Sequence, residues 1–281
     1  MIMRDKSRII SEAKPLWIKP QVAAQLVRNA RMRLPRGDWF WREAGKPDSL
    51  AVVCLHGAAH DGGQWQGLLE ALGRSTHCLA PDLPGVGESG RPRWESLPGL
   101  LAAIDEWLDA LRVDRLWLLG ADLGAWIAIS YALYRPHRVL GVLLVDPEQT
   151  LKGAQLRFRW PQLGSPRRRR QPATPSLLKR AVRSPESPIN LEWGTVRAEI
   201  LETKNWDSLV CPVWTLRAVR ETGRDRGRSA KGPHAAWLAQ TRQAFLPLEG
   251  GQQIQEAPEL VAEIIARTMA NPRSPILQLD L

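Results

Sequence analysis

Apolar and polar positions follow two periodicities along the chain, and their order predicts the class of fold. Short continuous apolar runs, typical of strands buried on both faces, recur throughout. They cover residues 39–41, 50–55, 76–80, 116–119, 139–145, 212–216 and 245–248. Apolar residues at helical spacing predict helices over residues 98–111, 125–132 and 258–269. Alternating strands and helices indicate an α/β fold with a doubly wound, mainly parallel sheet.

Two stretches break this pattern and define the expected domain organisation. Val22, Leu26 and Ala30 share one face of a helix predicted over residues 20–34. Six prolines lie between residues 161 and 188, where an inserted irregular or helical cap is expected. The predicted parts are a basic N-terminal extension at 1–37, a core at 38–146 and 209–270, a cap at 147–208 and a C-terminal tail at 271–281.

The charge and hydropathy of the chain limit the classes of partner that it is expected to bind. The chain carries 39 Lys and Arg against 29 Asp and Glu, and residues 157–183 hold nine basic residues and no acid. Such a segment is usually solvated, and it can also make weak contacts with an anionic surface. Since no aromatic RNA-binding signature or DNA-reading motif accompanies the arginines, no specific nucleic acid is expected. No apolar run approaches the ~20 residues of a transmembrane helix.

Cysteine usage bears on the compartment and on metals. Cys54, Cys78 and Cys211 all lie in or beside apolar, strand-like runs. Three sparse cysteines indicate reduced, packed thiols and therefore a cytoplasmic setting. No Cys and His cluster has the spacing of a zinc site, so we expect neither a metal nor a cofactor.

The turn at residues 120–124 is the most informative motif. Gly120 and Gly124 flank Asp122, an apolar strand precedes this segment, and a helical run follows it. The glycines leave room for the backbone around a strained central residue. This is the pattern of a nucleophile elbow, G-x-S-x-G, with aspartate in place of serine. We therefore predict that Asp122 occupies the position of a nucleophile.

Four further segments appear in the order found in one superfamily. They are His56-Gly57-Ala58, residues 81–89 (PDLPGVGES), Val145-Asp146-Pro147 and residues 248–258 (LEGGQQIQEAP). Together with the elbow, they resemble the α/β-hydrolase superfamily over residues 38–270. The resemblance implies an oxyanion hole formed by the main-chain amides of Ala58 and Leu123.

The resemblance also shows where the chain departs from the family pattern. An aspartate nucleophile forms an ester with the substrate, and a histidine after the last strand then activates water. Here that position holds Gln252, which cannot take up a proton near pH 7. The acid that would orient the histidine matches Glu221 at the later of two family positions, or Asp146 or Glu148 at the earlier one. Each can equally be a structural carboxylate.

The histidines and tyrosines of the chain limit the reactions that it is expected to catalyse. The chain has five histidines, none in that loop: His56, His60, His77, His137 and His234. His56 is interpreted as a residue that positions its loop. Haloalkane dehalogenases would place halide donors at Ala58 or Leu123, and epoxide hydrolases would place two tyrosines in the cap. Neither pattern is present, so neither activity is expected.

Two functions follow. In the first, a cofactor-free hydrolase acts on a small apolar molecule through Asp122, with impaired turnover because Gln252 replaces the base. In the second, a catalytically degraded family member binds a ligand or a partner. The residues within hydrogen-bond reach of the Asp122 carboxylate distinguish the two.

Overall fold

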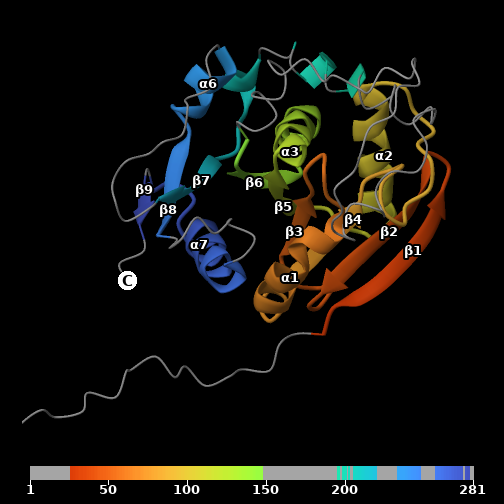
Figure 1. Cartoon of the computed structure of the whole chain (residues 1–281), viewed down its shortest axis with the longest axis horizontal. Coiled ribbons are helices and arrows are strands. Elements are labelled where there is room, and N and C mark those ends of the chain that lie inside the picture. The colour runs from red at the N-terminus through yellow and green to blue at the C-terminus, as the bar shows by residue number, and fades with distance from the viewer. Residues whose placement is uncertain are drawn as a thin grey trace, which may run out of the picture.

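The fold is a twisted sheet covered by helices on both faces (Figure 1). The computed structural model describes residues 26–147, 195–196, 198–200, 202, 205–219, 233–247, 257–274 and 276–278. Nine strands in these ranges form one sheet in the order β1-β2-β4-β3-β5-β6-β7-β8-β9. They are β1 (Arg28–Leu34), β2 (Gly37–Ala44), β3 (Ala51–Leu55), β4 (His77–Asp82), β5 (Leu116–Ala121), β6 (Val139–Val145), β7 (Val213–Val219), β8 (Arg242–Pro247) and β9 (Ile276–Gln278).

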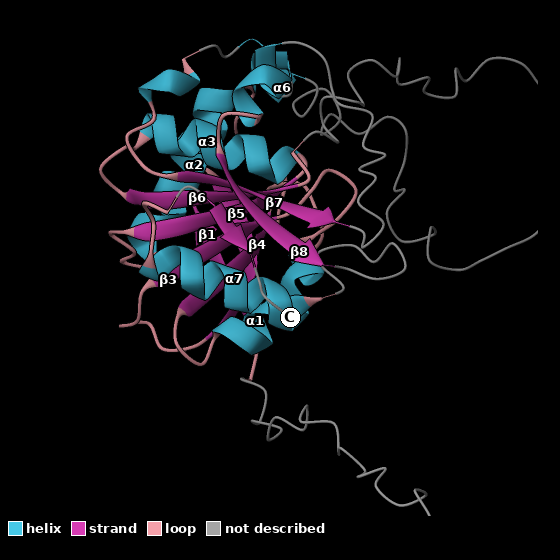
Figure 2. Ribbon diagram, turned by 90° about the vertical axis from the view of Figure 1, so that its left-hand side faces the viewer, coloured by secondary structure: helices cyan, strands magenta, loops and turns pink. Residues whose placement is uncertain are grey.

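The helices pack apolar side chains against the sheet, and the helix that follows the elbow is buried on all sides over most of its length. They are α1 (Gln66–Leu72), α2 (Leu97–Ala110), α3 (Leu123–Tyr134), α6 (Pro233–Leu238) and α7 (Pro258–Ala270), with 3-10 turns η1 (Gly62–Trp65) and η2 (Trp206–Ser208). The packed residues of α2, α3 and α6 belong to one apolar cluster, and those of α1 and α7 to a second. Figure 2 shows these two helix layers on opposite faces of the sheet.

The sheet runs mainly parallel, which confirms the predicted fold class. Strands β3 to β9 pair in parallel with their neighbours, whereas β2 pairs antiparallel with β1 and β4. Strands β3 and β5 are buried along their whole length, as their continuous apolar runs require. The predicted helices over residues 98–111 and 258–269 correspond to α2 and α7.

Two predictions at the ends of the chain are wrong. Arg28–Leu34 is strand β1, so the helix predicted over residues 20–34 does not extend through it. Ala30, Met32 and Leu34 pack against the core, while the residues between them are exposed. This two-residue period is that of a strand, and pairing with β2 stabilises it. Strand β9 lies within the expected tail, so residues 245–248 do not form the last strand.

Several predictions concern residues outside the described ranges. These are the extension before residue 26, the basic stretch at 157–183, Glu148, Glu221 and Gln252. Among the helices of the described residues, none has the length and apolar character needed to span a membrane.

Candidate active site

The elbow has the strained backbone that its sequence predicts. Asp122 lies between β5 and α3, with φ 49° and ψ −115°. A Cβ on Gly120 would come within 2.3 Å of the carbonyl oxygen of Gly124, and one on Gly124 within 2.3 Å of that of Leu55. Both positions therefore need glycine because the backbone on either side approaches so closely. Strain of this kind is tolerated where the surrounding structure fixes it, often at a functional site.

A main-chain amide faces the Asp122 carboxylate. The nitrogen of Ala58 donates a hydrogen bond to Oδ2 of Asp122 at 3.3 Å. Gly57 allows this approach, since a Cβ there would lie 3.1 Å from Cβ of Asp122. Leu123, the other residue expected to offer its amide, is the first residue of α3. Partial positive charge gathers at such a helix N-terminus and favours a nearby anion.

Hydrogen bonds to Gly57 orient the Ala58 amide. The carbonyl oxygen of Gly57 accepts from Nδ1 of His56 at 2.9 Å and from the amide of His60 at 3.1 Å. The Gly57 amide donates to Oε1 of Gln64 at 3.1 Å. Because a trans peptide is planar, holding the Gly57 carbonyl fixes the opposite direction for the Ala58 N–H. The loop thus presents a fixed donor to Asp122.

His56 is neutral and is committed to this loop. Its Nε2 accepts a hydrogen bond from the amide of Leu83 at 2.9 Å, so Nδ1 carries the proton. The ring is only 1% exposed, and its burial lowers its pKa. Both ring nitrogens are engaged, which confirms His56 as a residue that positions the loop.

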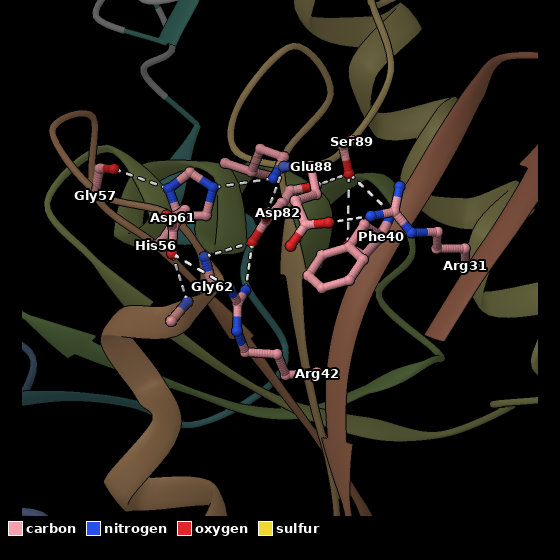
Figure 3. A network of polar contacts seen from close by, with 12 residues as sticks. Arg31, Phe40, Arg42, His56, Gly57, Asp61, Gly62, Asp82, Glu88 and Ser89 are labelled. Atoms are coloured by element: carbon pink, nitrogen blue, oxygen red, sulfur yellow. Dashed lines mark hydrogen bonds and ion pairs between the residues drawn. The ribbon is translucent and has the colours of Figure 1, made fainter. Parts of the chain in front are cut away.

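A buried carboxylate ties the neighbouring loops together (Figure 3). Oδ1 of Asp82 accepts hydrogen bonds from Nη1 of Arg42 at 2.7 Å and from the Gly62 amide at 2.8 Å. Oδ2 of Asp82 accepts from the Glu88 amide at 2.8 Å. The Ser89 hydroxyl donates to the Asp82 carbonyl at 2.6 Å. The segment that resembles the family's D-x-x-G-x-G-x-S loop is therefore a rigid support.

Two hydrogen bonds fix the end of β6 against the elbow. The Asp122 amide donates to the carbonyl of Val145 at 3.1 Å, and Nε1 of Trp126 donates to the carbonyl of Pro147 at 2.9 Å. Asp146 lies between these two acceptors, half-buried, with a φ of 45°. The structure thus brings Asp146 and Asp122 to adjacent strand ends.

The other histidines are placed elsewhere in the fold. His77 is buried in β4, and His60 and His137 are exposed. His234 lies in α6, its ring 4.4 Å from that of Trp206 and 5.2 Å from that of Trp126. Its burial among these rings lowers its pKa, and it is hydrogen bonded to the main chain of Ile200.

Two supporting residues, Gln64 and Trp126, were missed in the sequence. Trp126 lies in the first turn of α3, and its bond to Pro147 depends on how the end of β6 packs beside the elbow. The contact of Gln64 with Gly57 depends on how the loop folds back on itself. Neither contact has a local signal in the sequence.

Comparison with known proteins agrees with this geometry. Residues 51–245 match the family model described as the alpha/beta hydrolase fold. That match spans well over half of the chain, so the protein belongs to the α/β-hydrolase fold family.

The relatives differ in the share of their own length that matches this chain. The "1-acylglycerol-3-phosphate O-acyltransferase ABHD5" of Mus musculus is 39% identical over 124 residues, which is 41% of this chain and 35% of that protein. The chain therefore spans about a third of the length of this relative. The "Haloalkane dehalogenase" of Mesorhizobium japonicum is 27% identical over 257 residues, covering 91% of this chain and 74% of the relative. The solved epoxide hydrolase VrEH1 from Vigna radiata shares the fold, with a TM-score of 0.60, 17% identity, and coverage of 87% of this chain and 98% of that one.

Proposed function

We propose that Asp122 is a nucleophile that attacks a saturated carbon of a small, largely apolar molecule and forms an ester with it. One contact carries this proposal: the 3.3 Å hydrogen bond from the Ala58 amide to Oδ2 of Asp122. With Oδ2 held in this way, Oδ1 is the oxygen that attacks. The leaving group departs with the bonding electrons as the new C–O bond forms.

The same contact argues against an acyl substrate. In a serine-type site, the amide of residue 58 would stabilise the oxygen of the substrate's carbonyl. Here that donor is already directed at the nucleophile's own carboxylate. An alkyl electrophile needs no oxyanion hole in the first step. The amides of Ala58 and Leu123 instead stabilise Oδ2 when water later attacks Cγ of the ester.

We propose that release of this ester is slow. An ionised carboxylate attacks without help from a base, but hydrolysis of the ester requires one. The family's histidine position holds Gln252, and both nitrogens of His56 are engaged in the loop. The name of the haloalkane dehalogenase relative is consistent with displacement at saturated carbon. The apolar side chains of Ala58 and Leu123 offer no halide donor, so we propose a substrate whose leaving group needs little assistance.

We further propose that residues 147–208 form a cap over this site. Val196 and Ile200, near the end of that stretch, are buried against the core, which supports this proposal.

We also propose that the protein works in a reducing, cytoplasmic compartment. The free thiols of Cys54, Cys78 and Cys211 support this proposal.

Intact-mass measurement after exposure to 1-iodohexane tests the nucleophile. Iodide leaves readily, so the reaction does not depend on a halide donor. Peptide mapping should locate a hexyl group at Asp122 of the wild-type chain, and any labelling of the three free thiols is counted separately. The same treatment should leave position 122 unlabelled in the Asp122→Asn variant, since a neutral amide is a poor nucleophile.

The Asp114→Asn variant is a matched control, because Asp114 is an exposed aspartate outside the elbow. It should be labelled like the wild type. Equal labelling of wild type and Asp122→Asn would show that the alkylation is unrelated to the elbow. An unlabelled wild type would instead support the alternative of a member that only binds its ligand.

A further inference from the structure

The geometry at the end of β6 points to a base for the second step: we propose that Asp146 takes the proton of the water that hydrolyses the Asp122 ester. This inference rests on the proposed function of Asp122. It gives Asp146 a direct role in place of a role in orienting a histidine.

Backbone pairing places the two aspartates side by side. Ala121 of β5 and Val145 of β6 are partners in the parallel register, so Asp122 and Asp146 continue adjacent strands. Neighbouring strands lie about 4.8 Å apart. The two side chains therefore start from backbone positions separated by roughly that distance.

The elbow itself holds Asp146 in place from both sides. The Asp122 amide binds the carbonyl of Val145, the residue before Asp146, at 3.1 Å. The Trp126 indole binds the carbonyl of Pro147, the residue after it, at 2.9 Å. Both donors come from the turn and helix that carry the nucleophile. The backbone on each side of Asp146 is therefore tied to the elbow.

Asp146 and Asp122 both have a positive φ angle. Their φ angles are 45° and 49°, a region that non-glycine residues rarely adopt. Two such residues at adjacent strand ends mark a site whose strain is maintained by its surroundings. Asp146 is half-buried, which leaves part of its surface accessible to water.

The hydrolytic step then balances as follows. The oxygen of water bonds to Cγ of the ester as one of its protons moves to the Asp146 carboxylate, and the negative charge gathers on Oδ2 beside the Ala58 amide. The Cγ–Oδ1 bond breaks, and the departing alkoxide takes the proton from Asp146 to leave as the alcohol. The new carboxylic acid of Asp122 loses its remaining proton to solvent, which restores both carboxylates.

Single-turnover release after labelling with 1-iodohexane tests this role. Asp146→Asn keeps the shape of the side chain, and asparagine tolerates a positive φ better than most residues. We expect it to form the hexyl ester at the wild-type rate and to release hexanol about 100-fold more slowly, the low end of general-base effects. Asp114→Asn should release the alcohol like the wild type.

A rescue experiment separates a lost base from a distorted site. Asp146→Gly also suits a positive φ, and it opens space for a small carboxylate. Added formate should restore release in Asp146→Gly and leave Asp146→Asn unchanged. Two results would overturn the role of Asp146 without affecting the proposed nucleophile. One is release at the wild-type rate in Asp146→Asn, and the other is loss of both labelling and release in that variant. A wild type that forms no ester would overturn the proposed nucleophile, and this inference with it.

Discussion

Gly124 packs against the backbone of Leu55, so closely that a Cβ on Gly124 would lie 2.3 Å from the Leu55 carbonyl oxygen and 2.6 Å from that of His56. Neither carbonyl belongs to a flexible side chain that can turn away. We therefore predict that Gly124→Ala lowers the free energy of unfolding by about 3 kcal/mol. Urea denaturation of the purified variant measures this change.

Gly37→Ala is the matched control for that substitution. The nearest atom to a Cβ on Gly37 is 4.0 Å away, so the methyl group meets ordinary contact at most. We expect its free energy of unfolding to stay within about 0.5 kcal/mol of the wild type. A Gly124→Ala protein as stable as Gly37→Ala would contradict the close approach of α3 to β3.

The Gln64 side chain is expected to control the reactivity of Asp122 through the loop. Its Oε1 accepts the hydrogen bond from the Gly57 amide, in the residue before the Ala58 donor. Gln64→Ala should slow labelling of Asp122 by about fivefold, the equivalent of one ordinary hydrogen bond. Time-resolved intact-mass measurement gives this rate. Gln66→Ala is the control, because the side chain of exposed Gln66 bonds only to Glu70 among the described contacts. An equal loss in both variants would argue against a role of the loop.

Stability should fall when the solution is acidified below pH 6.5. Burial lowers the pKa of His56 from its ordinary 6.5, so the unfolded chain binds a proton more readily than the folded one. The stabilisation from neutral His56 is therefore present above pH 6.5 and is lost as pH falls toward the lowered pKa. The free energy of unfolding should drop by up to about 1.4 kcal/mol per pH unit for this group.

Denaturant curves at pH 7.5 and 5.5 test this dependence. His77 and His234 add to it in the same direction, because burial lowers the pKa of each. His56→Asn should therefore weaken the pH dependence without removing it. In His137→Asn, which replaces an exposed histidine, the free energy of unfolding should depend on pH as steeply as in the wild type. A slope in His56→Asn as steep as that of His137→Asn would show that His56 does not titrate as proposed.

Much of the fold could be predicted from local patterns, and β1 shows why part of it could not. The central strands are apolar on both faces, so their runs stand out in the sequence. In β1, alternating arginines and small or apolar residues fit a strand, but the positions of Val22, Leu26 and Ala30 also fit a helix. Pairing with β2, a tertiary contact, decides in favour of the strand.

Local patterns likewise predicted one part of the site, whereas the other part depends on long-range contacts. The G-x-D-x-G motif predicted the place of Asp122, and His56-Gly57 predicted the loop that supplies the Ala58 amide. The arrangement around Asp146 depends on long-range contacts, since the register of β5 with β6 and the bond from Trp126 to Pro147 join segments about twenty residues apart. No local pattern specifies such contacts.

Rapid-quench measurement of hexanol and of hexyl-Asp122 in one time course tests the central claim most directly. We predict that the wild type forms one equivalent of ester in a fast phase and releases hexanol slowly afterwards. Gln252→His should shorten the lifetime of the ester and allow repeated turnover. Fast repeated turnover by the wild type that disappears in Asp122→Asn would contradict the slow second step, and the absence of any ester at Asp122 would contradict the nucleophile itself.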